Sequence, residues 1–142
     1  MKKPTPLRKW GVAAASLLAL VLLNLTACST PEPLSVEERA QQRWDHVVAR
    51  EFEQAYEFFS PGYRETTPLH EYMIDALSRP VRWLNAEVIG ASCLEDVCRL
   101  SVEVTYQPAV GPGPLRQLRP TRTIEERWIR IDGVWWYTVN RG

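Results

Sequence analysis

Between residues 35 and 79, apolar positions recur every three or four residues, which places them on one face of an α-helix. Three apolar stripes follow one another: Val36, Ala40, Trp44, Val47 and Val48; Phe52, Ala55, Tyr56 and Phe59; and Leu69, Tyr72, Met73, Ala76 and Leu77. Ser35 and Glu38 fit a capping box at the start of the first stripe. Ser60-Pro61-Gly62 and Pro80 are stop signals after the second and third stripes. The pattern therefore predicts three helices.

After Pro80 the apolar positions alternate with period two, which is typical of β-strands. Four extended segments are predicted: residues 81–93, 98–107, 121–131 and 134–140. A bulge is expected near Gly90, and Asp132-Gly133 is a strong signal for a two-residue hairpin turn. Both faces of that last hairpin are apolar, so the sequence leaves open which one is buried. Helices followed by antiparallel strands predict an α+β domain, with three helices packed on a curved sheet of about four strands.

The first 28 residues have a different pattern. The chain opens with four basic residues: Lys2, Lys3, Arg8 and Lys9. An apolar run from Trp10 to Leu25 follows, which is short for a transmembrane helix. It ends in Leu25-Thr26-Ala27-Cys28, which resembles the bacterial lipobox. The resemblance implies that residues 1–27 are a cleaved lipoprotein signal peptide. It also implies that the Cys28 thiol receives a diacylglyceryl group and that the new amine is open to a further acyl chain such as palmitate.

This anchor predicts where the protein resides. Two or three acyl chains hold a protein stably at a bilayer. Cys28 is followed by Ser29 and not by Asp, which by resemblance to enterobacterial sorting rules favours the outer membrane. Residues 28–34 then form a lipidated tether and residues 35–142 the folded domain. We expect a cell-envelope protein that is lipid-anchored at the outer membrane, faces the periplasm and has the bilayer as one partner.

Charge excludes one class of partner. Seventeen Lys and Arg balance seventeen Asp and Glu in the whole chain. All three lysines and Arg8 lie in the first nine residues, so cleavage would leave 13 arginines facing 17 acids. A domain with this negative balance and no polybasic arm is not expected to bind nucleic acid.

Two cysteines remain if Cys28 carries lipid, and five positions separate them. An exported protein meets an oxidising compartment, so a structural disulfide between Cys93 and Cys98 that fixes a hairpin register is favoured. Two alternatives are weaker. A metal site would need two further ligands, and the two histidines, His46 and His70, lie far off in sequence. A redox motif would need a shorter spacing. No metal or cofactor is therefore expected.

Two segments carry a family resemblance. Residues 44–63 contain a small helix break and then an aromatic helix that ends in Ser-Pro-Gly-Tyr, and residues 126–137 form the final predicted hairpin. Both look like parts of the nuclear transport factor 2-like superfamily, which includes ketosteroid isomerases and polyketide cyclases. The resemblance implies a cone-shaped domain over residues 35–142, with a cavity between a curved sheet and the helices. It implies no particular reaction, because one fold hosts many functions.

The sequence contains no nucleotide-binding glycine loop, hydrolase motif or metal-ligand cluster. In the enzymes of that superfamily an acid or a tyrosine projects into the cavity, which makes Tyr56, Tyr63, Tyr72 and Asp75 the candidates here. Tyr56 and Tyr72 lie on the apolar helical stripes, so they are more simply core aromatics with hydrogen-bonded hydroxyls. The sequence therefore favours a protein that is not an enzyme.

Two adjacent tryptophans, Trp135 and Trp136, point to opposite faces of a predicted strand, so one of them lies outside the main core. Tryptophan beside arginine is typical of a binding hot spot. The sequence predicts a membrane-anchored envelope lipoprotein that binds a protein partner or a small apolar ligand, with Trp135, Trp136, Tyr56 and Tyr72 as contact candidates. Two alternatives stay open: a cavity enzyme of isomerase or cyclase type, and a periplasmic immunity-like lipoprotein.

Overall fold

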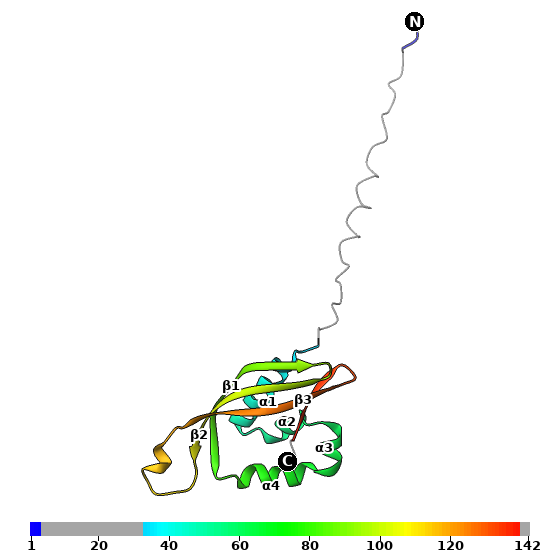
Figure 1. Cartoon of the computed structure of the whole chain (residues 1–142). Coiled ribbons are helices and arrows are strands. Elements are labelled where there is room, and N and C mark those ends of the chain that lie inside the picture. Colours follow the sequence, from blue (N-terminus) through cyan, green and yellow to red (C-terminus); the bar gives the residue numbers. More distant parts are fainter. Residues whose placement is uncertain (4–32, 140–142) are drawn as a thin grey trace. The chain divides into compact units, whose positions relative to one another are not determined.

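The computed structural model of the chain describes residues 1–3 and 33–139 (Figure 1). Every described helix and strand lies in the second range. The lipobox and Cys28 lie outside the described residues, as does the predicted cleavage site. No helix in the described ranges is long and apolar enough to cross a membrane.

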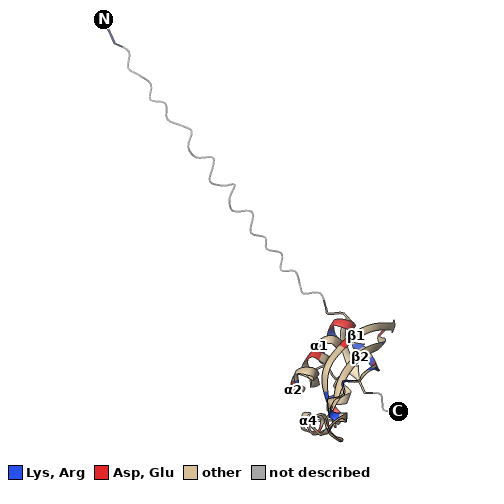
Figure 2. Cartoon of the chain, turned by 90° about the vertical axis from the view of Figure 1, so that its left-hand side faces the viewer, with Lys and Arg blue, Asp and Glu red and all other residues tan. Residues whose placement is uncertain are grey.

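The first helix, α1 (Val36–Ala49), begins where the capping box predicts. The Glu38 amide donates to the Ser35 hydroxyl at 3.2 Å, and the Ser35 amide donates to the Glu38 carboxylate at 2.8 Å. These two bonds satisfy free amides of the first turn, where Glu37 and Glu38 lie. Figure 2 shows acidic residues of α1 in red. Arg50 ends the helix in a left-handed conformation, with φ 64°.

Three further α-helices follow α1 where the sequence predicts two: α2 (Phe52–Tyr56), α3 (Pro61–Thr66) and α4 (Leu69–Ser78). A single turn of 3-10 helix, η1 (Leu115–Gln117), lies farther along the chain. The prediction of three helices is wrong because Ser60-Pro61-Gly62 begins a helix as well as ending one. Ser60 is the N-cap of α3 and its hydroxyl accepts the Tyr63 amide, while Pro61 occupies the first turn, where a missing N–H costs nothing.

The predicted strands form one antiparallel sheet in the order β1-β2-β3-β4: β1 (Val81–Leu94), β2 (Val97–Pro108), β3 (Thr121–Ile131) and β4 (Val134–Thr138). The pairing of β1 with β2 shifts between Val88 and Gly90, where the bulge was predicted. The last hairpin has the predicted register, with Ile131 opposite Val134. Asp132 and Gly133 both have positive φ, as a type I′ turn requires.

The predicted disulfide is present in the first hairpin. Cys93 on β1 lies directly opposite Cys98 on β2, and their sulfur atoms are bonded. Leu94 still pairs with Val97, so the turn itself consists of Glu95 and Asp96. The disulfide therefore joins the two strands one pair before the turn and fixes their register.

The helices cover one face of the sheet (Figure 1). On β2 the side chains facing them are fully buried: Cys98, Leu100, Val102 and Val104. Trp128 on β3 is also fully buried, and Tyr137 lies opposite it on β4 and packs against the core. The buried face of the last hairpin is therefore the one that carries Trp128 and Tyr137.

The outer edge of β4 is covered by the segment between α2 and α3. The Tyr137 amide donates to the Phe58 carbonyl at 2.8 Å, and the Ser60 amide donates to the Tyr137 carbonyl at 2.9 Å. Phe59 forms a parallel bridge with Tyr137. This pairing satisfies backbone groups that an edge strand would otherwise expose, and it explains why α2 ends at Tyr56, before Phe59.

Candidate functional site

A carboxylate is buried in the middle of the helix-facing side of the sheet. Glu126 on β3 is only 3% exposed. Side chains two residues apart on a strand share a face, so the alternation that buries Trp128 also buries Glu126 and turns it toward α1. A buried carboxylate is costly unless it is paired and hydrogen-bonded.

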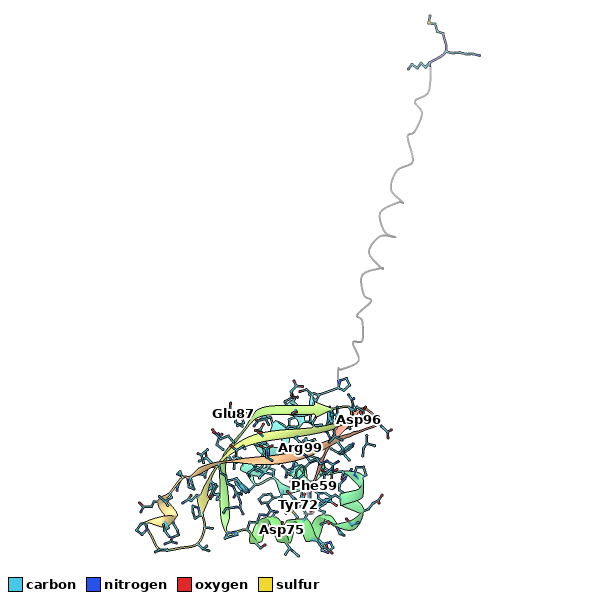
Figure 3. The ribbon with its side chains drawn as sticks, viewed as in Figure 1. Phe59, Tyr72, Asp75, Glu87, Asp96 and Arg99 are labelled. Carbon is cyan, nitrogen blue, oxygen red and sulfur yellow. A yellow bond between two sulfur atoms is a disulfide. The ribbon has the colours of Figure 1, made fainter. Side chains whose placement is uncertain are left out.

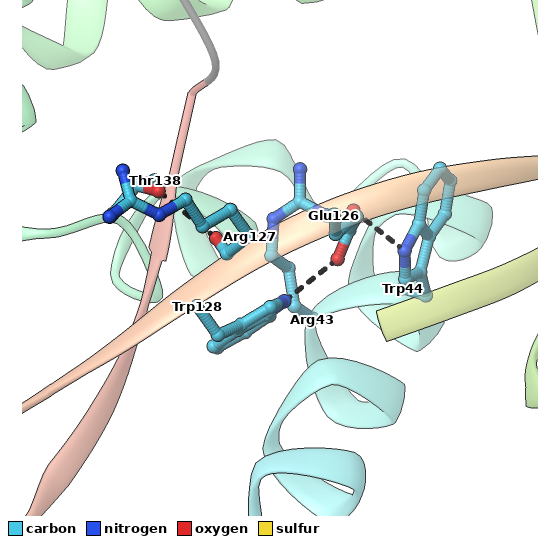
Figure 4. A network of polar contacts seen from close by, with 6 residues as sticks. All are labelled: Arg43, Trp44, Glu126, Arg127, Trp128 and Thr138. Atoms are coloured by element: carbon cyan, nitrogen blue, oxygen red, sulfur yellow. Dashed lines mark hydrogen bonds and ion pairs between the residues drawn. The ribbon is translucent and has the colours of Figure 1, made fainter. Parts of the chain in front are cut away.

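Three N–H donors meet this carboxylate (Figure 4). The Arg43 guanidinium lies 2.9 Å from Oε1, and the Trp44 indole N–H donates to the same oxygen at 3.0 Å. The Trp128 indole N–H donates to Oε2 at 2.9 Å. Arg43 and Trp44, which are adjacent on α1, and Trp128 on β3 thus all donate to the Glu126 carboxylate. Both of its oxygens accept hydrogen bonds.

Arg43 completes the cluster and faces the aromatic core. It is 7% exposed, and its guanidinium carbon lies 4.0 Å from the centroid of the Tyr137 ring. Cations favour the faces of aromatic rings. Its Nε is buried with no hydrogen-bond partner among residues 33–139. Arg43 therefore keeps an N–H donor, on Nε, that Glu126 does not accept.

A cavity of about 210 Å³ opens beside this cluster, between the sheet and helices α1, α2 and α4. Aromatic rings form much of its wall: Trp44, Phe52, Phe59 and Trp83. Phe59 and Tyr72 lie between the sheet and α4 (Figure 3). Arg43 lines the cavity and Glu126 does not. The cavity therefore combines an apolar wall with access to a buried cation.

Three tyrosines also line the cavity, and burial raises the pKa of each hydroxyl: Tyr63, Tyr72 and Tyr137. Burial acts in this direction because it disfavours the phenolate. The three hydroxyls therefore remain protonated at neutral pH. The Tyr63 hydroxyl already has a hydrogen bond with Thr67, whereas those of Tyr72 and Tyr137 have no hydrogen-bond partner among the described residues.

An ion pair lies on the open side of the cavity. Arg79 contacts the Asp75 carboxylate at 2.6 Å, one helical turn apart. Both side chains are more than half exposed and both line the cavity. Exposed pairs of this kind contribute little to stability, so breaking this pair would cost the fold little.

The two tyrosines predicted as contact candidates lie in different environments. Tyr72 lines the cavity, whereas Tyr56 does not and donates its hydroxyl to the Thr67 carbonyl at 2.9 Å. The sequence interpretation of Tyr56 as a core aromatic with a hydrogen-bonded hydroxyl is confirmed. Within the described part of the chain, no hydrogen bond joins a tyrosine to a carboxylate or a histidine.

The two candidate tryptophans, Trp135 and Trp136, are both half-buried. Trp135 packs beside the core on the helix-facing side, with the Arg130 guanidinium 5.0 Å from its ring. Trp136 lies on the opposite face of β4, and Arg39 and Arg64 approach its ring at 5.0 and 5.3 Å. Neither ring is freely exposed, so neither forms a large apolar patch.

The sequence analysis missed Arg43, Glu126 and Tyr137, which form the polar side of the site. Glu126 precedes Trp128 by two residues, so both side chains lie on the same face of β3. This spacing predicts a buried Glu126 only once the face that carries Trp128 is known to be the buried one. Among the described residues, no group of three or more His, Cys, Asp or Glu is arranged to hold a metal ion.

No protein-family model and no curated protein matches this chain. Solved structures do. One is a SEC-C motif-containing protein from Rhodopseudomonas palustris, with 14% sequence identity and a TM-score of 0.57. The match covers 74% of this chain and 76% of the chain of that protein. Another SEC-C motif-containing protein, from Psychrobacter arcticus, matches 75% of this chain at 11% identity with a TM-score of 0.59. This chain spans 60% of the length of that second structure.

These neighbours correct the family resemblance given by residues 44–63 and 126–137. The chain is similar in fold to SEC-C motif-containing proteins, so its assignment to the nuclear transport factor 2-like cone fold is wrong. The coarser prediction of an α+β domain with helices before a four-stranded antiparallel sheet is confirmed. Alternating strands and amphipathic helices specify layers, and the layers alone do not distinguish one family from another.

Proposed function

We propose that this protein is a binding module of the cell envelope, without catalytic activity, whose cavity holds a small molecule with an apolar body. The observation that carries the proposal is the cavity itself, which has aromatic walls and a few converging polar groups. Ligand sites commonly combine these two features. The half-buried state of Trp135 and Trp136 favours a small ligand over a protein partner.

The ionisable groups of the cavity support binding over catalysis. A general acid or base must exchange a proton with the substrate. Asp75, the acid that lines the cavity, is paired with Arg79. The Arg43 guanidinium is paired with Glu126. The described lining therefore offers hydrogen-bond donors to orient a ligand but no free acid or base to move its protons.

A cavity-filling variant tests this proposal. Ala76 lines the cavity from α4, so Ala76→Phe should fill it and abolish saturable binding of 2-naphthoate and its neutral amide, both measured by calorimetric titration. Ala49→Phe is the matched control, because Ala49 is an exposed helical residue outside the cavity. Failure of both compounds to bind the unmodified chain would contradict the proposal.

The location is part of the same proposal: an acylated Cys28 would hold the domain at the outer membrane, facing the periplasm. Cys28→Ala removes the thiol that forms the thioether, so the variant should remain an uncleaved precursor without lipid. Growth with a radiolabelled fatty acid, followed by gel electrophoresis, measures the result. Equal label in Cys28→Ala and the unmodified protein would exclude lipidation at this residue.

A further inference from the structure

We infer that the cavity is specific for a small organic carboxylate with a flat apolar body. This inference rests on the proposed binding function and adds the chemical class of the ligand. Three features of the cavity carry it: guanidinium groups in its lining, two hydroxyl donors without an acceptor among the described residues, and walls made of aromatic rings.

The guanidinium groups are those of Arg43, which belongs to the buried ion pair, and Arg79. Among the described residues, the charged side chains that line the cavity are those of Arg43, Arg79 and Asp75. Glu126, which balances Arg43, does not line the cavity, and its two oxygens already accept three N–H groups of the protein. The described part of the lining thus has two cations and one anion. A ligand with one negative charge would be attracted to the guanidinium groups that line the cavity, whereas a cation would be repelled by them.

The unused donors are the hydroxyls of Tyr72 and Tyr137. Within residues 33–139 neither hydroxyl has a hydrogen-bond partner, unlike the Tyr56 hydroxyl, which bonds the Thr67 carbonyl. Both tyrosines interact electrostatically with Arg43 and Arg79, so the hydroxyls and the guanidinium groups face one region. A carboxylate only accepts hydrogen bonds, and bonds to a charged acceptor are stronger than neutral ones. This region therefore suits a carboxylate.

The walls limit the rest of the ligand. Trp44 and Trp83 meet edge to face with their centroids 5.5 Å apart, and Phe52 and Phe59 also line the cavity. Pockets for drug-sized ligands have volumes of roughly 300–1,000 Å³, whereas this cavity has about 210 Å³. A body of one or two fused rings is therefore favoured over an extended chain or a larger ring system.

A matched series of compounds tests the charge preference. The full-length chain, purified in a non-ionic detergent, is titrated by calorimetry with 2-naphthoate, 2-naphthamide and 2-naphthylmethylammonium, and detergent alone serves as the blank. These compounds share one ring system and differ in the charge of the head group. The carboxylate should bind at least about tenfold more tightly than the amide, because hydrogen bonds to a charged group are the stronger ones. The ammonium compound should bind most weakly.

Two single-atom variants locate the carboxylate. Tyr72→Phe and Tyr137→Phe each remove one hydroxyl and keep the ring, so each should weaken naphthoate binding about tenfold and amide binding less than about threefold. Tyr56→Phe is the matched control, because Tyr56 is an equally buried neighbour whose hydroxyl lies outside the cavity. It should leave the preference for the carboxylate unchanged.

The outcomes separate this inference from the proposed function. Equal affinity of the unmodified chain for naphthoate and naphthamide, with both blocked by Ala76→Phe, would overturn the carboxylate inference and leave the binding function standing. Binding of neither compound would overturn both. Tyr72→Phe and Tyr137→Phe could also weaken the binding of naphthoate and naphthamide equally, with unchanged thermal unfolding. That result would overturn the carboxylate inference, because the hydroxyls would then not distinguish a charged ligand from a neutral one.

Discussion

Glu126→Ala is expected to lower the free energy of unfolding by about 3–5 kcal/mol, the cost typical of removing one partner from a buried ion pair. The substitution leaves the buried Arg43 charge without its counter-charge, and it leaves the Trp44 and Trp128 indole N–H groups without their acceptor. Urea-induced unfolding followed by far-ultraviolet circular dichroism measures the change. Glu126→Gln keeps one acceptor oxygen but not the charge, so its loss should be smaller than that of alanine.

The adjacent residue provides the control. Glu125 lies on the open face of β3, is exposed, and accepts a hydrogen bond from the Ser101 hydroxyl at 2.7 Å. Glu125→Ala should change the free energy of unfolding by less than about 1 kcal/mol, as is usual for surface substitutions. Similar losses for Glu125→Ala and Glu126→Ala would contradict the role of Glu126 as the centre of a buried cluster.

Trp128→Ala is expected to cost a similar amount, about 3–5 kcal/mol, for a different reason: it leaves a large cavity in the core. Trp128 is 0% exposed and packs with Leu100 and Cys98 of β2 and with Val36 and Ala40 of α1. It also donates its indole N–H to Glu126. The same unfolding measurement applies, with the slope on urea concentration checked for constancy, since a changed slope would indicate a change in compactness.

Trp136→Ala is the matched control for this second substitution, because Trp136 is half-buried and lies on the other face of the hairpin. We expect Trp136→Ala to lower the free energy of unfolding by about 1 kcal/mol, which is near the average for point substitutions. A loss for Trp136→Ala as large as that for Trp128→Ala would mean that the opposite face of the hairpin carries the core.

Most elements of the fold follow from local patterns in the sequence. The first and third helical stripes, the capping box at Ser35, the alternation on β2 and the turn at Asp132-Gly133 each depend on residues close together in the chain, and the structure has them at the expected places. Helix α3 was not predicted, because Ser60 and Pro61 were interpreted only as the end of a helix, whereas they also begin α3.

The candidate site was less accessible to prediction. Tyr72 was identified from its position on an apolar helical stripe, and it lines the cavity. Arg43 and Glu126 were not identified, because they are 83 positions apart in the chain and each resembles an ordinary charged residue between apolar neighbours. Their pairing depends on the orientation of β3 against α1, which no local pattern encodes.

The sequence by itself determined most of the secondary structure, the register of the last hairpin and the pairing of Cys93 with Cys98, because hydrogen-bonding geometry and short spacings act within a few residues. Only the tertiary structure decided which face of the last hairpin is buried, and with it whether Glu126 lies in water or in the core. The reason is physical: both faces of that hairpin are apolar enough to be buried, so its own residues do not distinguish them. The packing of Trp128 against α1 and the pairing of Phe58–Ser60 with β4 determine which face is buried.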